Sequence, residues 1–474
     1  MEEGGRGVKS DKWGYQVKTS SDACISAINA FYDQVLSYGR GRSVILKAPI
    51  HDQHCVLANI LAAHYLCSIG TDPSKISSYL LSAKSNYDEA TCYEKAIFDA
   101  VSYLMTEDRD DDVAVELHAQ IARDFPKDLV SLKRAQILCF YMGQPKLTLD
   151  LIQQVLPKNQ EASYIYGMLA FPLLELGDMK NAEQAARKAL EINEHDFWAQ
   201  HCLCHVLQQE CHFEEAVKFM EECSWSWNSC LSFMYVHNWW HVAVCYLEGH
   251  SPIGKVLDVY DYNLMRELER PDSSPVEVYI NALGLLLRVF VHGEIGMFED
   301  RLKDIATHLT NQTIWYVEWH LDLLSLWALA TTGEHPAAKN LLDGLKSRVS
   351  KMNLKKQLKM QRGLLLAEAL YEYGKGNDEK ALALLGLDFD AMDYKMIGAS
   401  DEQLDVFNEV WYSLLLNTGN ATKATHAIEK QLKNREGVPF LWRLLEKAYL
   451  MQGRQEAASA AAEKANALEN AYFK

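Results

Sequence analysis

The chain of 474 residues repeats itself at a fixed interval of about 34 residues, and this period constrains its fold more than any other feature. In the stretch LAFPLLELGDMKNAEQAARKALEINEHD, an apolar segment ends at Gly177, a short turn follows, and a second amphipathic segment begins. A shift by one period in either direction places Gly143 and Cys211 on Gly177. The same shift places Ala216 on Ala182, where two crossing helices leave room only for a small side chain. The period therefore predicts stacked pairs of helices.

This unit resembles the tetratricopeptide repeat, in which a helix-turn-helix pair cannot bury its apolar face alone and must stack on its neighbours. The resemblance implies an all-α fold, a right-handed α-solenoid with a concave groove. Six units fit the period: 95–128, 129–162, 163–196, 197–230, 405–438 and 439–472.

Between these blocks the period loosens, because the glycines that end the first helices of successive units are spaced more widely than in the regular repeats. We therefore expect insertions there, and we divide the chain into four parts. These are an N-terminal helical cap with degenerate repeats, four regular repeats, irregular repeats with insertions, and two C-terminal repeats, at 1–94, 95–230, 231–404 and 405–474.

Composition limits what such a solenoid can bind. A formal net charge of -17 would repel a phosphate backbone, so we expect no nucleic-acid partner. No apolar run approaches the roughly 20 residues that a membrane span needs, so we expect no membrane partner either. The N-terminal stretch MEEGGRGVKSDKWGY lacks the basic and apolar segments of a signal peptide, and the cysteines lie in apolar helical patterns. These features predict a cytoplasmic protein that binds a basic or neutral protein partner.

A second resemblance depends on local motifs between residues 202 and 261. The motifs are CLCHVLQQECHFEEAVKFMEE, SWSWNSCLSF, HNWWH and VLDVYD. With them the chain resembles the tetratricopeptide-repeat protein 38 family over nearly its whole length. The resemblance implies a cytosolic repeat protein and assigns it no reaction. Cys211 departs from the simple repeat pattern, because a glycine usually ends the first helix in a left-handed conformation that other residues adopt less readily.

The first helix of a tetratricopeptide unit generally lines the groove with positions 2, 5, 9, 12 and 13. We apply this rule to 163–196, to 197–230 and, with a slightly longer turn, to the next unit. Together with the HNWWH motif, it yields nine candidate groove residues: Phe171, Trp198, His201, His205, Gln208, Gln209, His237, Trp240 and His241.

Four of these candidates are histidines in two pairs, His201 with His205 and His237 with His241. Residues four apart share one face of a helix, which is the geometry that paired metal ligands use. If the pairs face each other, four imidazoles, or three and a water, could hold zinc or another divalent ion. A histidine here could also act as a general base near pH 7. The alternative is a packing seam, with tryptophans as apolar bulk and histidines as its hydrogen-bonded edge.

Three functions follow from these patterns. We favour a protein-interaction scaffold or adaptor that binds a peptide or partner protein in its groove, since no HExxH or other catalytic motif of known spacing accompanies the histidines. The second is a metal-assisted hydrolase, or another enzyme, that uses the four histidines. The third is a self-associating structural protein, which would form a homo-oligomer. We assign no catalytic residue, and a divalent metal such as zinc is the one cofactor that the pattern suggests.

Overall fold

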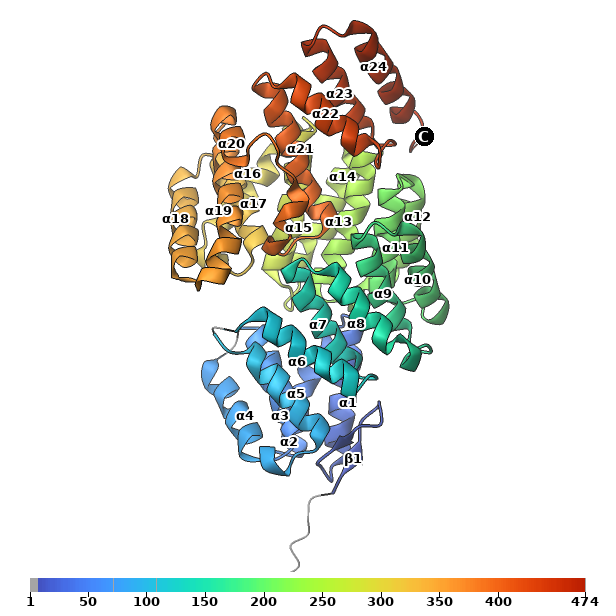
Figure 1. Ribbon diagram of the computed structural model, residues 1–474, viewed down its shortest axis with the longest axis vertical. Coiled ribbons are helices and arrows are strands. Elements are labelled where there is room, and N and C mark those ends of the chain that lie inside the picture. The colour runs from blue at the N-terminus through green and yellow to red at the C-terminus, as the bar shows by residue number, and fades with distance from the viewer. Residues whose placement is uncertain (1–6, 71, 108, 474) are drawn as a thin grey trace, which may run out of the picture. The chain divides into compact units, whose positions relative to one another are not determined.

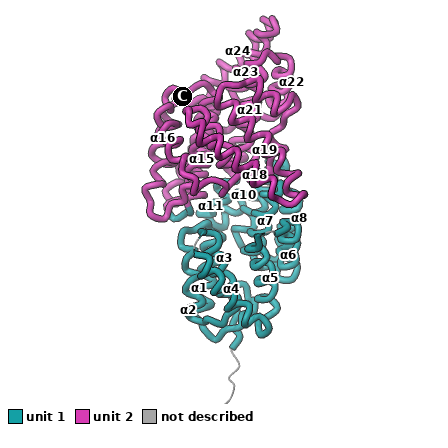
Figure 2. Tube along the Cα trace, turned by 90° about the vertical axis from the view of Figure 1, so that its left-hand side faces the viewer, with its two compact units in different colours: residues 1–202, 229–231 teal, residues 203–228, 232–474 magenta. Residues whose placement is uncertain are grey.

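The computed structural model describes residues 7–70, 72–107 and 109–473. The first six residues of the N-terminal stretch discussed above lie outside the described part of the chain. The chain divides into two compact units (Figure 2). The first comprises Met1–Cys202 with Ser229–Leu231, and the second comprises Leu203–Asn228 with Ser232–Lys474.

The described residues of the first unit are mainly helical. They also form one short antiparallel hairpin, β1 (Lys9–Ser10) and β2 (Gln16–Val17), with two residues in each strand, and an isolated bridge between Gly39 and Cys230. The sequence predicts no strand, and strands this short leave no pattern. The α-helices are α1 (Asp22–Leu36), α2 (Ala48–His51), α3 (Val56–Ser68), α4 (Pro73–Ser85), α5 (Cys92–Leu104), α6 (Asp111–Asp124), α7 (Leu129–Met142), α8 (Pro145–Val155), α9 (Ser163–Glu175), α10 (Met179–Ile192) and the first half of α11 (Phe197–Gln209). The 3₁₀ helices are η1 (Gly41–Lys47), η2 (Tyr87–Glu89) and η3 (Leu156–Lys158).

The regular repeats keep the period that the sequence predicts. Helices α7, α9 and α11 begin at Leu129, Ser163 and Phe197, so their starts are equally spaced along the chain. Helix α7 begins where it does because Asp128 accepts two hydrogen bonds of 3.0 Å from backbone N–H groups of the first turn. It ends at Gly143, whose φ of 67° is left-handed. The chain is therefore an all-α array of helix pairs, as its period predicts.

Cys211 ends α11 in the second unit and takes the conformation that the repeat usually reserves for glycine. Its φ is 62°, which is left-handed. A Cβ built at Gly437 would lie 2.6 Å from the Cβ of Cys211, so only a glycine fits at position 437. Cys211 thus stands where a glycine usually ends the first helix of the repeat. The segment that packs against this turn supplies a glycine, Gly437.

The second unit is entirely helical in its described residues. Its α-helices are the second half of α11, α12 (Phe213–Cys223), α13 (Ser232–Glu248), α14 (Ile253–Val259), α15 (Pro275–Val291), α16 (Glu299–Leu309), α17 (Trp319–Thr331), α18 (His335–Lys351), α19 (Leu354–Gly374), α20 (Asp378–Leu385), α21 (Asp401–Asn417), α22 (Ala421–Leu432), α23 (Pro439–Met451) and α24 (Gln455–Glu469). The shorter helices are η4 (Ser224–Ser229), the π-helix η5 (Tyr260–Leu264), η6 (Met265–Glu269), η7 (Ile295–Met297), η8 (Gln312–Ile314) and η9 (Ala391–Ile397).

Helix α21 gives the second unit a contact that a linear solenoid lacks. In a linear array each repeat contacts only its neighbours. Here α21 packs against α15, although the five helices α16 to α20 lie between them in the sequence (Figure 1). Arg435, which lies between α22 and α23, likewise pairs with Glu248 at the end of α13. The C-terminal part of the unit therefore packs onto α13 and α15.

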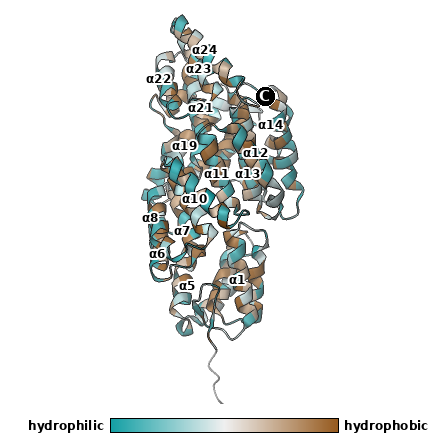
Figure 3. Ribbon diagram, turned by 90° about the vertical axis from the view of Figure 1, so that its right-hand side faces the viewer, coloured by the Kyte–Doolittle hydropathy of each residue, from teal (hydrophilic) through white to brown (hydrophobic). Residues whose placement is uncertain are grey.

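The helices differ in how much of their surface is buried. Figure 3 shows hydrophilic and hydrophobic residues mixed along the helices. The buried residues of α10 are all alanines, whereas most residues of α13 are buried. This contrast marks α10 as an amphipathic outer helix and α13 as a central one. Within the described ranges, none of the helices combines the length and apolar character needed to cross a membrane.

We expect Ala182→Leu and Ala216→Leu each to lower the free energy of unfolding by about 1–3 kcal/mol, because a larger side chain overpacks the helix crossing. Both alanines are fully buried, Ala182 on α10, which packs against α9, and Ala216 on α12, which packs against α13. Denaturant titration measures the change. Lys188→Leu at an exposed position of α10 is the control and should have little effect. Equal midpoints for all three variants would contradict the packing described here.

Candidate functional site

Helices α11 and α13 place three of the predicted histidines together inside the second unit. His205 lies on α11, and His237 and His241 lie on α13. Their exposed fractions are 0%, 3% and 0%. One ring nitrogen of each lies within 4.8 Å of a ring nitrogen of the others. We call these three residues the histidine cluster.

Each imidazole of the histidine cluster has an oxygen acceptor beside its Nδ1. The three contacts are His205 Nδ1 to Oε1 of Glu402 at 2.7 Å, His237 Nδ1 to Oδ1 of Asn281 at 2.7 Å, and His241 Nδ1 to Oε1 of Gln208 at 2.9 Å. The acceptors come from α21, α15 and α11, so three helices hold the rings in place.

The rings also pack on one another and on a tryptophan. The ring centroids of His205 and His241 are 4.2 Å apart, and those of His237 and His241 are 4.8 Å apart. Trp240 stacks on His237 with a centroid distance of 5.2 Å and an interplanar angle of 7°. The second tryptophan of the motif, Trp239, contacts Trp227 instead, at 5.2 Å. The HNWWH motif thus supplies both the imidazoles and an apolar wall against one of them.

His201 lies one helical turn before His205 on α11, and the two side chains therefore share a face of that helix. The boundary between the units falls after residue 202, so His201 belongs to the first unit. Its participation as a fourth ligand stays a prediction.

Buried charged groups surround the histidine cluster in the second unit. Glu248 Oε2 is 2.8 Å from Nη2 of Arg435 and accepts a hydrogen bond of 3.0 Å from Nε2 of Gln208. Arg288 lies 3.3 Å from Oε1 of Glu409 and donates to the backbone carbonyl of Glu402. None of these charged side chains is more than 6% exposed. Ion pairs at this depth are tolerated because each charge has a partner of opposite sign.

The sequence predicts an open polar groove at these positions, and the structure buries them instead. Gln208 is 0% exposed and Trp240 1% exposed, in addition to the three histidines. The reason is the packing of α21 and of the segment around Arg435 onto α13 and α15, which a strictly linear array would not contain. Gln209 is half-buried and accepts a hydrogen bond of 3.3 Å from Arg435.

Phe171 and Trp198, the two remaining groove candidates, belong to the first unit. Phe171 is 6% exposed and Trp198 is half-buried, and their rings lie 5.0 Å apart. Phe171 also contacts Phe140 on α7 at a centroid distance of 5.9 Å. Phe140, Phe171 and Trp198 therefore form a row of aromatic rings along the first helices of the regular repeats.

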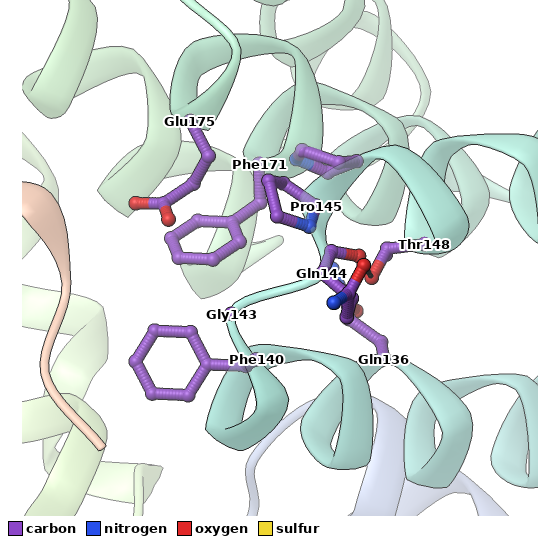
Figure 4. A pocket seen from close by; sticks show the side chains of 9 residues that line it. Gln136, Phe140, Gly143, Gln144, Pro145, Thr148, Phe171 and Glu175 are labelled. Atoms are coloured by element: carbon purple, nitrogen blue, oxygen red, sulfur yellow. Dashed lines mark hydrogen bonds between the residues drawn. The ribbon is translucent and has the colours of Figure 1, made fainter. Parts of the chain in front are cut away.

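A small pocket opens beside this row (Figure 4). Phe140 and Phe171 lie on one side of it, and Gln136 and Thr148 lie on another. Its volume of about 10 Å³ holds one water molecule at most, so the pocket is not a small-molecule site.

Sequence reasoning missed Asn281 and Glu402, which contact two of the histidines, the buried Arg288, and the exposed Ile137 of the first unit. Asn281 and Arg288 are isolated polar side chains in the apolar stretch VEVYINALGLLLRVFV, and such a residue in a buried helix usually has a polar partner. Ile137 takes the same position of its repeat as Phe171 and is 45% exposed. The repeat register could have identified it.

Burial keeps several histidines neutral. Loss of solvation lowers the pKa of His237 to about 4, although the hydrogen bond to Asn281 opposes this shift. The same cause lowers the pKa of His118 on α6 to about 4 and that of His320 on α17 to about 3. All three imidazoles are uncharged at neutral pH.

The fold defines an all-α solenoid of tetratricopeptide-like helix pairs. No protein-family model matches the chain. Among solved structures, it is similar to a human IFIT1 dimer with m7Gppp-AAAA, with 14% sequence identity, a TM-score of 0.39, and coverage of 95% of this chain and 91% of that one. It is also similar to the P58(IPK) TPR domain, with 12% identity, a TM-score of 0.22, and coverage of 80% and 93%. A third is a structure of Naa15/Naa10 bound to HypK-THB, with 14% identity, a TM-score of 0.24, and coverage of 80% and 64%. At these scores the similarities assign no function to this chain.

We expect Arg435→Met to lower the free energy of unfolding by about 3–5 kcal/mol, because the carboxylate of Glu248 then loses its closest cation while it stays buried. Chemical denaturation followed by circular dichroism measures the change. The double variant Arg435→Met with Glu248→Gln should recover part of the loss, since no unpaired charge remains. An unfolding midpoint identical to wild type for Arg435→Met would show that the pair is not formed in solution.

Stability should fall between pH 7 and pH 5. His118 and His320 stay neutral in the fold, whereas in the unfolded chain they bind protons below their ordinary pKa of 6.5. The unfolded state therefore binds more protons in this range, and each histidine contributes a loss of about 2 kcal/mol. Melting temperatures across this pH range test the expectation.

The double variant His118→Gln with His320→Gln should flatten this pH dependence. His426→Gln is the matched control, because His426 is an exposed histidine and its loss should leave the slope unchanged. Equal slopes for all three proteins would contradict the burial of uncharged imidazoles.

Proposed function

We propose that this chain is a protein-interaction scaffold whose first unit binds an extended apolar segment of a partner protein across α5, α7 and α9. The observation that carries the proposal is a row of apolar side chains at equivalent positions of three repeats, Tyr103, Ile137 and Phe171. Ile137 in the middle of this row is 45% exposed. Tyr103 is half-buried and Phe171 is 6% exposed, so Ile137 is the exposed member of the row. A single exposed isoleucine is ordinary, but apolar side chains spaced by the repeat suit an extended segment.

The surroundings of the row favour a partner rather than a small molecule. Phe140 contacts Phe171, the last residue of the row. The pocket next to these two rings holds one water molecule at most. The net charge of -17 favours a partner segment that carries basic residues beside its apolar ones, since opposite charges accelerate and orient association.

Of the other two functions, the hydrolase fits these observations less well, and self-association is distinguished by experiment. A hydrolase that used the histidine cluster would need a path for its substrate, and those imidazoles are at most 3% exposed. Self-association would place a second copy of the chain on the same row, and the experiment below separates this outcome from binding of another protein.

We expect a photo-cross-linking amino acid at position 137 to form adducts with a partner protein in cells. The same amino acid at position 147 is the matched control, because Leu147 is also exposed, at 36%, but lies on α8, the second helix of the same repeat. The purified partner should bind wild type and lose affinity at least tenfold for Ile137→Glu. Leu147→Glu should bind as wild type does, and both variants should keep the wild-type melting temperature, since exposed substitutions change stability little.

Identical adducts at both positions would contradict the proposal. Adducts of two copies of this chain at position 137, together with a dimer in light scattering that Ile137→Glu dissociates, would replace it with the self-associating function.

A further inference from the structure

The oxygen atoms beside the histidine cluster favour one protonated nitrogen in each ring. The acceptors at Nδ1 are a carboxylate oxygen of Glu402 and amide oxygens of Asn281 and Gln208. An oxygen acceptor requires a proton on the nitrogen that faces it. Nδ1 is therefore the N–H of His237 and His241, and the carboxylate of Glu402, 2.7 Å from Nδ1 of His205, favours the same tautomer there. The lone pair of a neutral ring with this tautomer resides on Nε2.

The two amides cannot easily rotate to present nitrogen instead of oxygen. Nδ2 of Asn281 donates to the backbone carbonyl of Glu277 at 2.8 Å. Nε2 of Gln208 donates to Glu248 at 3.0 Å, and Arg435 holds that carboxylate from another direction. Each amide is thus fixed at its NH₂ end, which leaves the oxygen for the histidine.

This arrangement is the one that metal-binding histidines show. A ligating imidazole binds the metal through one nitrogen and donates the other N–H to a carboxylate or carbonyl oxygen, which fixes the ring and makes it a stronger ligand. Here three rings from two helices share the pattern, and one nitrogen of each lies within 4.8 Å of the others. Zinc bonds of about 2.0–2.1 Å in a tetrahedron place neighbouring ligand atoms roughly 3.3 Å apart, so small inward shifts of the rings complete the geometry.

We propose that the second unit binds one divalent ion of the zinc class through Nε2 of His205, His237 and His241. Imidazole ligands suit zinc, cobalt, nickel and copper, whereas magnesium and calcium prefer oxygen ligands. The sequence leaves the fourth ligand open between His201 and a water molecule, and we assign a water molecule to this position of the tetrahedron.

The role of this ion is structural. The three ligands are at most 3% exposed, so a substrate has no direct access to them. Glu402 connects α21 to the histidine cluster, because its carboxylate oxygen lies 2.7 Å from Nδ1 of His205. The ion would therefore link α11 and α13 directly, and would strengthen the contact of α21 by making the N–H of His205 a better donor.

The test uses the full chain, stripped of metal by a chelator and dialysed. We expect titration with Co²⁺ to produce the visible d–d absorption of a tetrahedral, nitrogen-rich site, with saturation at one equivalent. Zn²⁺ should displace Co²⁺ and raise the melting temperature, and Mg²⁺ and Ca²⁺ should do neither. These measurements need no variant. Absence of both the cobalt absorption and a zinc-dependent rise in melting temperature would overturn the proposal and leave a hydrogen-bonded packing seam.

Variants then locate the site. His237→Gln and His241→Gln should each abolish the cobalt absorption, and Glu402→Gln, which keeps the ligands, should weaken Zn²⁺ binding by about 10–100-fold. His292→Gln is the matched control. His292 is a histidine of the same unit that stacks on Phe440 at 3.7 Å and contacts Glu409.

The control should bind Co²⁺ as wild type does, and circular dichroism confirms that each variant is folded. A cobalt absorption retained in both cluster variants, or lost equally in His292→Gln, would assign the metal to another place on the chain and overturn the proposal.

Discussion

Compensation of buried charge is the constraint on which the second unit depends. Arg288 and Arg435 lie in the interior, where an unpaired guanidinium would be strongly unfavourable, and carboxylates from α13 and α21 neutralise them. These pairs join residues far apart in the sequence, so they form only when α21 and the turn before α23 are docked. The same docking covers the polar face of α11 and α13. A polar surface that would be open in a linear array is therefore buried in the second unit.

The two units therefore differ in whether the same repeat position is exposed or buried. In the first unit, buried alanines such as Ala182 allow close helix crossings, and larger apolar side chains remain at the surface of the first helices. Ile137 on α7 is one of these and is 45% exposed. In the second unit the equivalent position is His205, which is enclosed and oriented by Glu402. The proposed binding surface and the proposed metal site therefore share no residue.

Much of the fold follows from the sequence, because a repeat is a local property. The starts of α7, α9 and α11 depend on a turn residue, a cap and a small residue at each helix crossing, all within a short stretch of chain. The pairing of His237 with His241 is equally local, since one helical turn separates them. The positions of Asn281 and Glu402 beside these rings could not be derived in the same way. They depend on the packing of α15 against α13 and of α21 against α15, which joins segments far apart in the sequence.

The sequence by itself determined the class of fold, the helix pairs of the regular repeats and the residue types in the histidine cluster. The tertiary structure decided whether those residues face water or the interior. The physical reason is that periodicity reports which face of a helix is apolar, whereas burial of a polar face requires a partner from elsewhere in the chain. For Gln208 and the histidine cluster, that partner is α21 with the segment around Arg435. No local sequence pattern near residue 208 predicts this packing.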